Sequence, residues 1–329
     1  MSAEGGTKAV VAALLANLGI AVTKFLAFAL TGFSSMLAEA IHSLADSLNQ
    51  LLLLFGGRRS TRAATPEHPF GYGRERYVYA FVVSIVLFSL GGLFALYEAY
   101  HKWHEAHAGT VEDPLASRWW WVPVVVLVVS IALEGMSFRT AARESRHAKG
   151  TSTWVQYIRG AKAPELPVVL LEDSAALIGL TLALLGVGLT LLTGDAYWDA
   201  VGTGLIGVLL VLVAVTLAVE MKSLLIGEAA LPAHQRAIAE ALAAPEAVDR
   251  VIHLKTLHLG PDELLVAAKI AVGRADSAEE VAAAIDEAEE RARAAVPALR
   301  LVMYLEPDID RGPTLGEPSG SPGYAAGVG

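Results

Sequence analysis

Residues 166–193 read LPVVLLEDSAALIGLTLALLGVGLTLLT, a run in which only Glu172 and Asp173 are ionisable. A helix rises about 1.5 Å per residue, so about 20 such residues cross the hydrocarbon core of a bilayer. The run is long and apolar enough to do so. We therefore predict a membrane-spanning helix over these residues.

Five further apolar segments of similar length flank this run: residues 9–30, 34–55, 77–100, 119–139 and 199–221. Hydrophobic residues make up 54% of the chain and charged residues 18%, whereas soluble proteins carry about 25% charge. This composition excludes a disordered protein and one that coats nucleic acid. The first segment lacks the basic leader and cleavage site of a signal peptide. We predict an all-α bundle of six transmembrane helices over residues 9–221, after a cytoplasmic segment at 1–8.

The loops predict how the bundle is oriented. Two loops, after the second and the fourth span, collect most of the basic residues: Arg58, Arg59, Arg62, Arg74, Arg76, Arg139, Arg143, Arg146, Lys149, Arg159 and Lys162. The opposite loops contain Lys102 and Arg118. By the positive-inside rule, both termini are cytoplasmic. The Ala-, Gly- and Val-rich composition and the missing targeting sequence favour a bacterial inner membrane.

The pattern changes after Met221. Helices are expected at 232–244 and 277–296, and β-strands at 248–259, 263–272 and 300–305. The order α-β-β-α-β predicts a small α+β ferredoxin-like domain over residues 222–307, on the cytoplasmic side. Residues 308–329 are rich in Gly and Pro and are expected to form a disordered tail.

Ionisable side chains inside the spans are costly, so each is a candidate functional residue. Cysteine is absent, which leaves His, Asp, Glu and backbone oxygen to hold a metal ion. His42 and Asp46 are four residues apart, so both project from one helix face and one cation can contact both. Imidazole with carboxylate suits Zn²⁺ and other first-row divalent ions. Asp173, inside the fifth span, is the natural third ligand.

Each of these residues also has a structural alternative. A single His or Asp in a bundle is commonly an interhelical hydrogen-bonding group. Three such groups without enough buried bases favour a bound cation instead. Lys24 is the one base well inside a predicted span, and we expect it to form an ion pair with Glu134 or Glu39.

Four stretches, in this order, resemble the cation diffusion facilitator family: His42-x-x-x-Asp46, HPFGYGRERY at 68–77, LEDSAALIG at 171–179 and WDA at 198–200. The resemblance covers residues 9–307. It implies a homodimeric antiporter that exports Zn²⁺, or in some branches Mn²⁺, Fe²⁺, Co²⁺, Ni²⁺ or Cd²⁺, in exchange for protons. It also implies that His42, Asp46 and Asp173 form the transport site, with the metal ion as substrate and no cofactor.

The resemblance is incomplete at one ligand. Many zinc-exporting relatives have a second His four residues before the Asp of span five, where this chain has Val169. The fourth ligand stays open between Asn49, which shares the face of His42 and Asp46, Glu172 and water. Glu172 is expected to face elsewhere, since neighbouring positions on a helix are about 100° apart. More oxygen ligands would move the preference from Zn²⁺ towards Mn²⁺ or Fe²⁺.

The small domain offers further possible metal ligands: His234, His253, His258, Glu306 and Asp308. Their spacing matches no metal-binding motif, and isolated His residues are usually solvated.

These features favour a proton-driven transporter of a divalent cation, with Zn²⁺ as the leading candidate. Ligands must lose their protons to bind the ion, and protons displace it on the other side of the membrane. An intramembrane metal enzyme, a cation channel and a metal sensor are the alternatives. The sequence has neither a His-Glu-x-x-His helix nor a GxxxxGK nucleotide-binding loop, so we expect neither a zinc hydrolase nor direct use of ATP.

Overall fold

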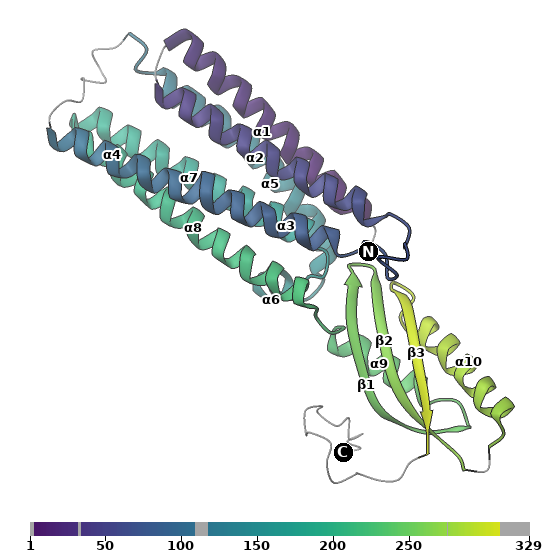
Figure 1. Cartoon of the computed structure of the whole chain (residues 1–329). Coiled ribbons are helices and arrows are strands. Elements are labelled where there is room, and N and C mark those ends of the chain that lie inside the picture. The colour runs from purple at the N-terminus through teal and green to yellow at the C-terminus, as the bar shows by residue number, and fades with distance from the viewer. Residues whose placement is uncertain (1–2, 32–33, 109–117, 275, 310–329) are drawn as a thin grey trace. The chain divides into compact units, whose positions relative to one another are not determined.

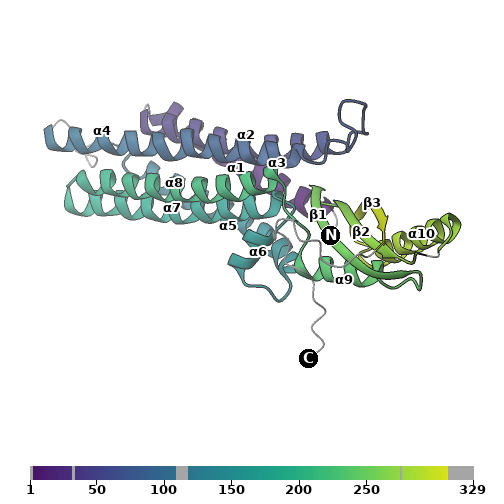
Figure 2. The ribbon, with the colours of Figure 1, turned by 60° about the horizontal axis from the view of Figure 1, so that its bottom comes forward.

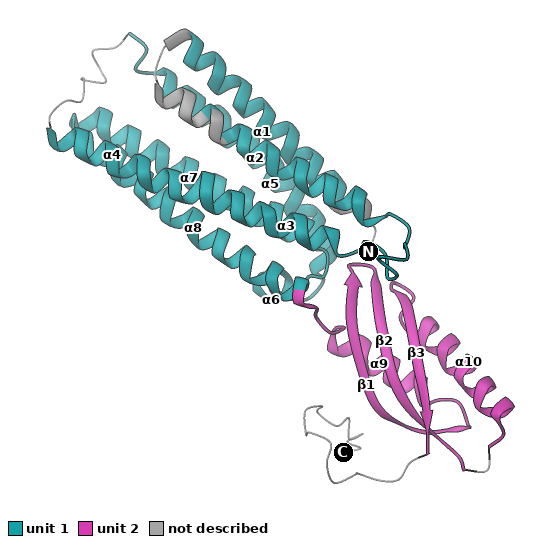
Figure 3. Ribbon diagram, in the orientation of Figure 1, with its two compact units in different colours: residues 1–225 teal, residues 226–329 magenta. Residues whose placement is uncertain are grey.

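The computed structural model describes residues 3–31, 34–108, 118–274 and 276–309 (Figure 1). For residues 3–6, 30–31, 34–39 and 41–42 it describes the backbone without the side chain. Long helices that run side by side come first along the chain, and a three-stranded sheet with two helices follows (Figure 2). The chain divides into two compact units, residues 1–225 and 226–329 (Figure 3).

In the described part of the first unit, all regular structure is helical. Its elements are α1 (Ala3–Thr31), α2 (Ser34–Ser60), α3 (Glu75–Val86), the π-helical segment η1 (Leu87–Leu93), α4 (Phe94–Ala108), α5 (Val122–Lys149), α6 (Trp154–Gly160), α7 (Glu165–Thr193) and α8 (Tyr197–Ile226). The segments predicted from their apolar length all coincide with helices, apart from the first three residues of the fourth, which form a turn before α5.

Five helical stretches are long and apolar enough to cross a membrane: Thr7–Ala29, Glu75–Ala108, Val122–Lys149, Glu165–Thr193 and Tyr197–Ile226. Their length and composition indicate an integral membrane protein. Helix α2 is not among them in the part of the chain that the structure describes. Its described side chains include Asp46, Arg58 and Arg59, which lower its hydropathy. The sixth crossing, over residues 34–55, stays a prediction.

The third span departs from the uniform helix that its sequence predicts. Its middle, η1, is π-helical, and the chain is α-helical on both sides. A π-helical turn takes one more residue than an α-helical turn and is commonly found near functional sites. Gly91 and Gly92 lie in η1 and are buried.

Glycines allow the third and sixth spans to approach closely. A Cβ at Gly92 would lie 2.6 Å from Val211 Cγ2, and a Cβ at Gly207 would lie 2.9 Å from the backbone nitrogen of Leu96. Real Cβ atoms are essentially never this close to another atom. Small residues at such positions let helices pack by van der Waals contact where no hydrophobic force drives them together.

Ion pairs join neighbouring spans at both ends of the first unit. At the end rich in arginine, Arg76 Nε lies 2.9 Å from Glu165 Oε1 and connects α3 with α7. At the other end, Lys102 Nζ lies 2.8 Å from Asp199 Oδ2 and connects α4 with α8. Each pair therefore ties the third span to a helix that follows much later in the chain.

The second unit has the predicted order of elements, α-β-β-α-β. These are α9 (Pro232–Leu242), β1 (Val248–Gly260), β2 (Glu263–Val272), α10 (Ala278–Ala295) and β3 (Arg300–Asp308). The sheet order is β1-β2-β3, with β1 antiparallel and β3 parallel to β2. The last strand is longer than predicted and ends at Asp308. The predicted tail from 310 onward lies outside the described residues.

The core of the second unit lies between one face of the sheet and both helices. Alternate residues of β2 are buried, among them Leu264 and Val266, and they pack with Ile238 of α9 and Ala288 of α10. This alternation is the pattern of a strand that is covered on one face. Ser277 caps α10 in a capping box with Glu280. Hydrogen bonds from the Ser277 backbone and hydroxyl lower the pKa of Glu280.

We predict that Gly207→Ala destabilises the first unit by about 1–3 kcal/mol, because the added methyl group collides with Leu96 in a closely packed interface. Gly188→Ala is the matched control, since a Cβ there meets nothing within 4 Å. The melting temperatures of both variants, measured in one detergent, check this. Equal melting temperatures would contradict the close approach of α4 and α8.

Candidate functional site

A cavity of about 30 Å³ lies inside the first unit, and six helical elements line it. The lining residues are Asn17 of α1, Asp46 and Gln50 of α2, Leu87 of η1, Glu134 of α5, Glu172, Asp173 and Ala176 of α7, and Leu210 of α8. Four of them are carboxylic acids. A cavity of this size holds one ion or a water molecule or two.

Asp173 is held in place by α5. Its side chain is 2% exposed, and its Oδ2 accepts a hydrogen bond of 2.7 Å from Ser137 Oγ. A hydroxyl donor stabilises the charged form of a buried carboxylate. The bond engages one of the two carboxylate oxygens.

Asp46 reaches the same cavity from α2, so the structure brings two of the three predicted ligands together. The backbone of His42 lies in α2, one turn before Asp46, but its side chain lies outside the described residues. Among the side chains that are described, no three His, Asp or Glu residues are close enough to hold a metal ion. Metal binding by His42, Asp46 and Asp173 therefore stays a prediction.

Glu172 lines the cavity too, contrary to the expectation that it faces elsewhere. Its Oε1 accepts a hydrogen bond of 3.1 Å from Asn49 Nδ2, and its Oε2 accepts one of 3.0 Å from Gln50 Nε2. Gln50 Oε1 in turn accepts a hydrogen bond of 3.3 Å from Asn17 Nδ2. The rule of about 100° per residue describes where Cβ points, whereas the longer Glu side chain reaches across to α2.

The same contacts bear on Asn49 as a fourth ligand. Its amide nitrogen must face Glu172, because a carboxylate only accepts hydrogen bonds. Asn49 Oδ1 is buried and has no hydrogen-bond partner among the described residues. Asn49 is not one of the residues that line the cavity.

The predicted ion pair between Lys24 and Glu134 is not formed. Lys24 Nζ donates a hydrogen bond of 2.9 Å to Ser43 Oγ. Within the described residues Glu134 takes part in no hydrogen bond and no ion pair, although its side chain is only 5% exposed. The side chain of Glu39, the alternative partner of Lys24, lies outside the described residues.

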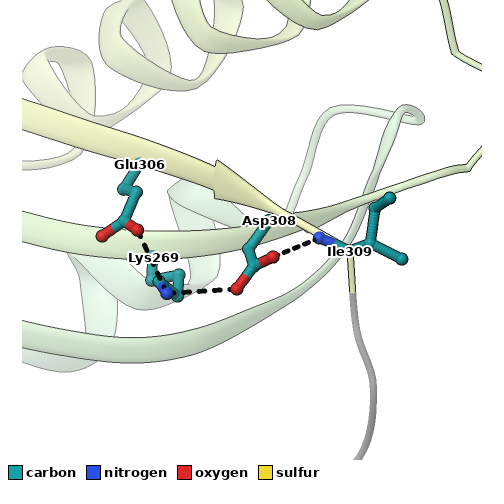
Figure 4. Close-up of polar contacts among 4 residues, drawn as sticks. All are labelled: Lys269, Glu306, Asp308 and Ile309. Atoms are coloured by element: carbon teal, nitrogen blue, oxygen red, sulfur yellow. Dashed lines mark hydrogen bonds and ion pairs between the residues drawn. The ribbon is translucent and has the colours of Figure 1, made fainter.

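In the second unit the candidate acids bind a lysine. Lys269 Nζ lies 3.1 Å from Glu306 Oε1 and 3.1 Å from Asp308 Oδ2, and the Ile309 backbone donates to Asp308 Oδ1 (Figure 4). Hydrogen bonds to Asp308, which has the larger effect, and to Glu306 raise the pKa of Lys269.

The three candidate histidines of the second unit, His234, His253 and His258, join no group of possible metal ligands within the described part of the chain. His258 is buried, with Nδ1 3.1 Å from the Gly260 carbonyl oxygen.

Sequence reasoning missed the polar residues that support the acids. Gln50, Asn17 and Ser137 were given no role, although each is a polar residue inside an apolar run. The sequence carries one signal for Ser137: Ser130, Glu134 and Ser137 are spaced to fall on one face of a helix. In the structure all three are buried.

Comparisons with known proteins support this picture of a transmembrane unit. The family model of the cation efflux transmembrane domain matches residues 10–226. The mitochondrial proton-coupled zinc antiporter SLC30A9 of Xenopus laevis is 33% identical over 275 residues, which are 82% of this chain and 47% of that protein. Metal tolerance protein C4 of Arabidopsis thaliana is 29% identical over 266 residues, 80% of this chain and 56% of that protein.

A bacterial relative matches a shorter part. Magnetosome protein MamB of Magnetospira sp. (strain QH-2) is 31% identical over 129 residues, 39% of this chain and 40% of that protein. The chain spans about half the length of the Xenopus and Arabidopsis relatives. Since the family model covers nearly all of the helical unit and a relative above 30% identity covers most of the chain, the protein belongs to the cation efflux family, the cation diffusion facilitators.

Proposed function

We propose that the protein is a secondary active transporter that exports a divalent metal cation from the cytoplasm in exchange for protons. Zn²⁺ is the leading candidate for this cation. The observation that carries this proposal is the cavity inside the transmembrane helices, where Asp46 of α2 and Asp173 of α7 share the lining. Membership of the cation efflux family supports it. So does the name of the Xenopus relative, a proton-coupled zinc antiporter.

The proposed ligands are His42, Asp46 and Asp173, with the metal ion as substrate. His42 precedes Asp46 by one turn of α2, so both can contact one ion. Ser137 holds one oxygen of Asp173 and leaves the other to the ion. The ion binds when these groups have lost their protons, and protons from the other side compete it away. Histidine suits this exchange because its usual pKa lies near physiological pH.

The proposal includes the architecture around the site. Helix α2 is the sixth crossing, residues 9–221 form the transmembrane domain, and both termini are cytoplasmic. Residues 222–307 form a cytoplasmic ferredoxin-like domain, and two copies of the chain assemble into a homodimer. From composition we assign the protein to a bacterial inner membrane, whereas the Xenopus relative is named as mitochondrial. Alternating access then follows from movement of helices around a fixed site.

A transporter of the same type that prefers Mn²⁺, Fe²⁺ or Co²⁺ is the second candidate. The observation that favours it is the oxygen-rich lining of the cavity, with four carboxylic acids, and Val169 one turn before Asp173. Carboxylates suit harder ions, whereas imidazole suits Zn²⁺. An intramembrane enzyme gains no support, because the family is one of cation efflux proteins.

We predict that Asp173→Asn abolishes metal flux in proteoliposomes, because the amide lacks the charge that holds a divalent cation. The amide oxygen can still accept the hydrogen bond from Ser137, so folding should be preserved. Asp195→Asn is the control, since Asp195 caps α8 and asparagine caps a helix equally well. Normal transport by Asp173→Asn would show that the third ligand is wrongly assigned.

We predict that an acidic vesicle lumen drives uptake of Zn²⁺ into proteoliposomes, because each ion that enters is exchanged for protons that leave. A protonophore that dissipates the gradient should reduce uptake to the level of protein-free vesicles. Competition by Mn²⁺, Fe²⁺, Co²⁺ and Cd²⁺ in the same assay ranks the ions. Uptake that is indifferent to the pH gradient would indicate a channel, and the absence of any flux would indicate a sensor or an enzyme.

A further inference from the structure

Glu134 is an acid of the cavity for which the described residues provide no hydrogen bond and no ion pair. It lies on α5, is 5% exposed, and lines the same cavity as Asp46 and Asp173. Within the described residues it takes part in no hydrogen bond and no ion pair. An ionised carboxylate buried among apolar helices needs a compensating charge. An unpartnered, nearly buried side chain at a cavity therefore points to a cationic ligand.

The neighbouring charged and polar groups are already engaged with other partners. Asp173 is bound by Ser137, and both oxygens of Glu172 accept hydrogen bonds from amides of α2. Lys24, the nearby base, donates a hydrogen bond to Ser43, and its charge acts on Glu134 without a direct ion pair. Glu134 thus differs from Glu172, which lines the same cavity but is oriented by two donors.

Helix α7 offers no second donor one turn before Asp173. The residue one turn before Asp173 is Val169, which is fully buried and carries no donor atom. A third helix, α5, brings an oxygen donor to the cavity through Glu134. Acids from α2, α5 and α7 thus line the same cavity.

We propose that Glu134 is a ligand of the transported cation, with Asp46 and Asp173, and that it biases the site towards oxygen-preferring ions such as Mn²⁺. This inference rests on the proposed transport function. Since no three described acids lie close enough to hold an ion as they stand, binding requires the Glu134 side chain to turn towards the ion. A glutamate has three side-chain torsions with which to do so.

The test is equilibrium binding of Mn²⁺ and of Zn²⁺ to the full chain in lipid nanodiscs, measured by titration calorimetry. Glu134→Gln keeps the shape and removes the charge. We expect it to weaken Mn²⁺ binding at least about tenfold, the size of effect that even an outer partner of a metal site produces. Zn²⁺ binding should weaken less, because imidazole contributes more to it. Glu98→Gln on α4 is the matched control, since Glu98 does not line the cavity.

A second variant covers a failure of Glu134→Gln to fold. Glu134→Asp keeps the charge but shortens the reach, so Mn²⁺ should bind more weakly than to wild type while the melting temperature stays close to it. Unchanged Mn²⁺ affinity in whichever variant folds would overturn the role of Glu134 and leave the transport proposal intact. A wild-type protein that binds neither ion would contradict the proposed function itself.

Discussion

Every carboxylic acid inside the first unit must be matched by a donor, a proton or a cation, and this requirement organises the helices around the cavity. Ser137 matches Asp173, and two amides of α2 match Glu172. These bonds connect α5 with α7 and α2 with α7. The contacts that lower the cost of burying the acids therefore also hold these helices together. In a surrounding without water, unmatched polar groups are far more costly than at a soluble surface.

The long helices of the first unit were predictable from the sequence because apolar length is a property of each segment alone, whereas the short helix α6 and the π-helical segment η1 were not predicted. The choice of Asp46 and Asp173 followed from a different argument, the cost of ionisable residues inside a span, and both line one cavity. What failed were statements about single side chains between helices. Glu172 reaches the cavity through its length, and Lys24 bonds to Ser43 rather than to Glu134. Such contacts depend on rotamers and on helix packing, which the spacing of residues does not encode.

The second unit shows the same limit at a strand. The prediction ended the last strand at 305, so Glu306 and Asp308 fell outside it as possible metal ligands. In the structure the parallel pairing continues, and it places Glu306 opposite Lys269 and Asp308 opposite Ala271. Both acids then reach the lysine (Figure 4). Register between strands decides this, and a single strand carries no information about it.

The π-helical segment η1 changes the angular register of side chains between the two halves of the third span. Because each residue turns an α-helix by about 100°, the extra residue in the wide turn rotates all side chains of α4 relative to those of α3. In this arrangement Leu87 lines the cavity, together with Leu210 of α8, and Leu96 packs against Gly207 of the same helix. A single-residue deletion within Leu87–Leu93 would rewind the segment and swing Leu96 away from its glycine. The length of this stretch is thus constrained even where its side chains are interchangeable.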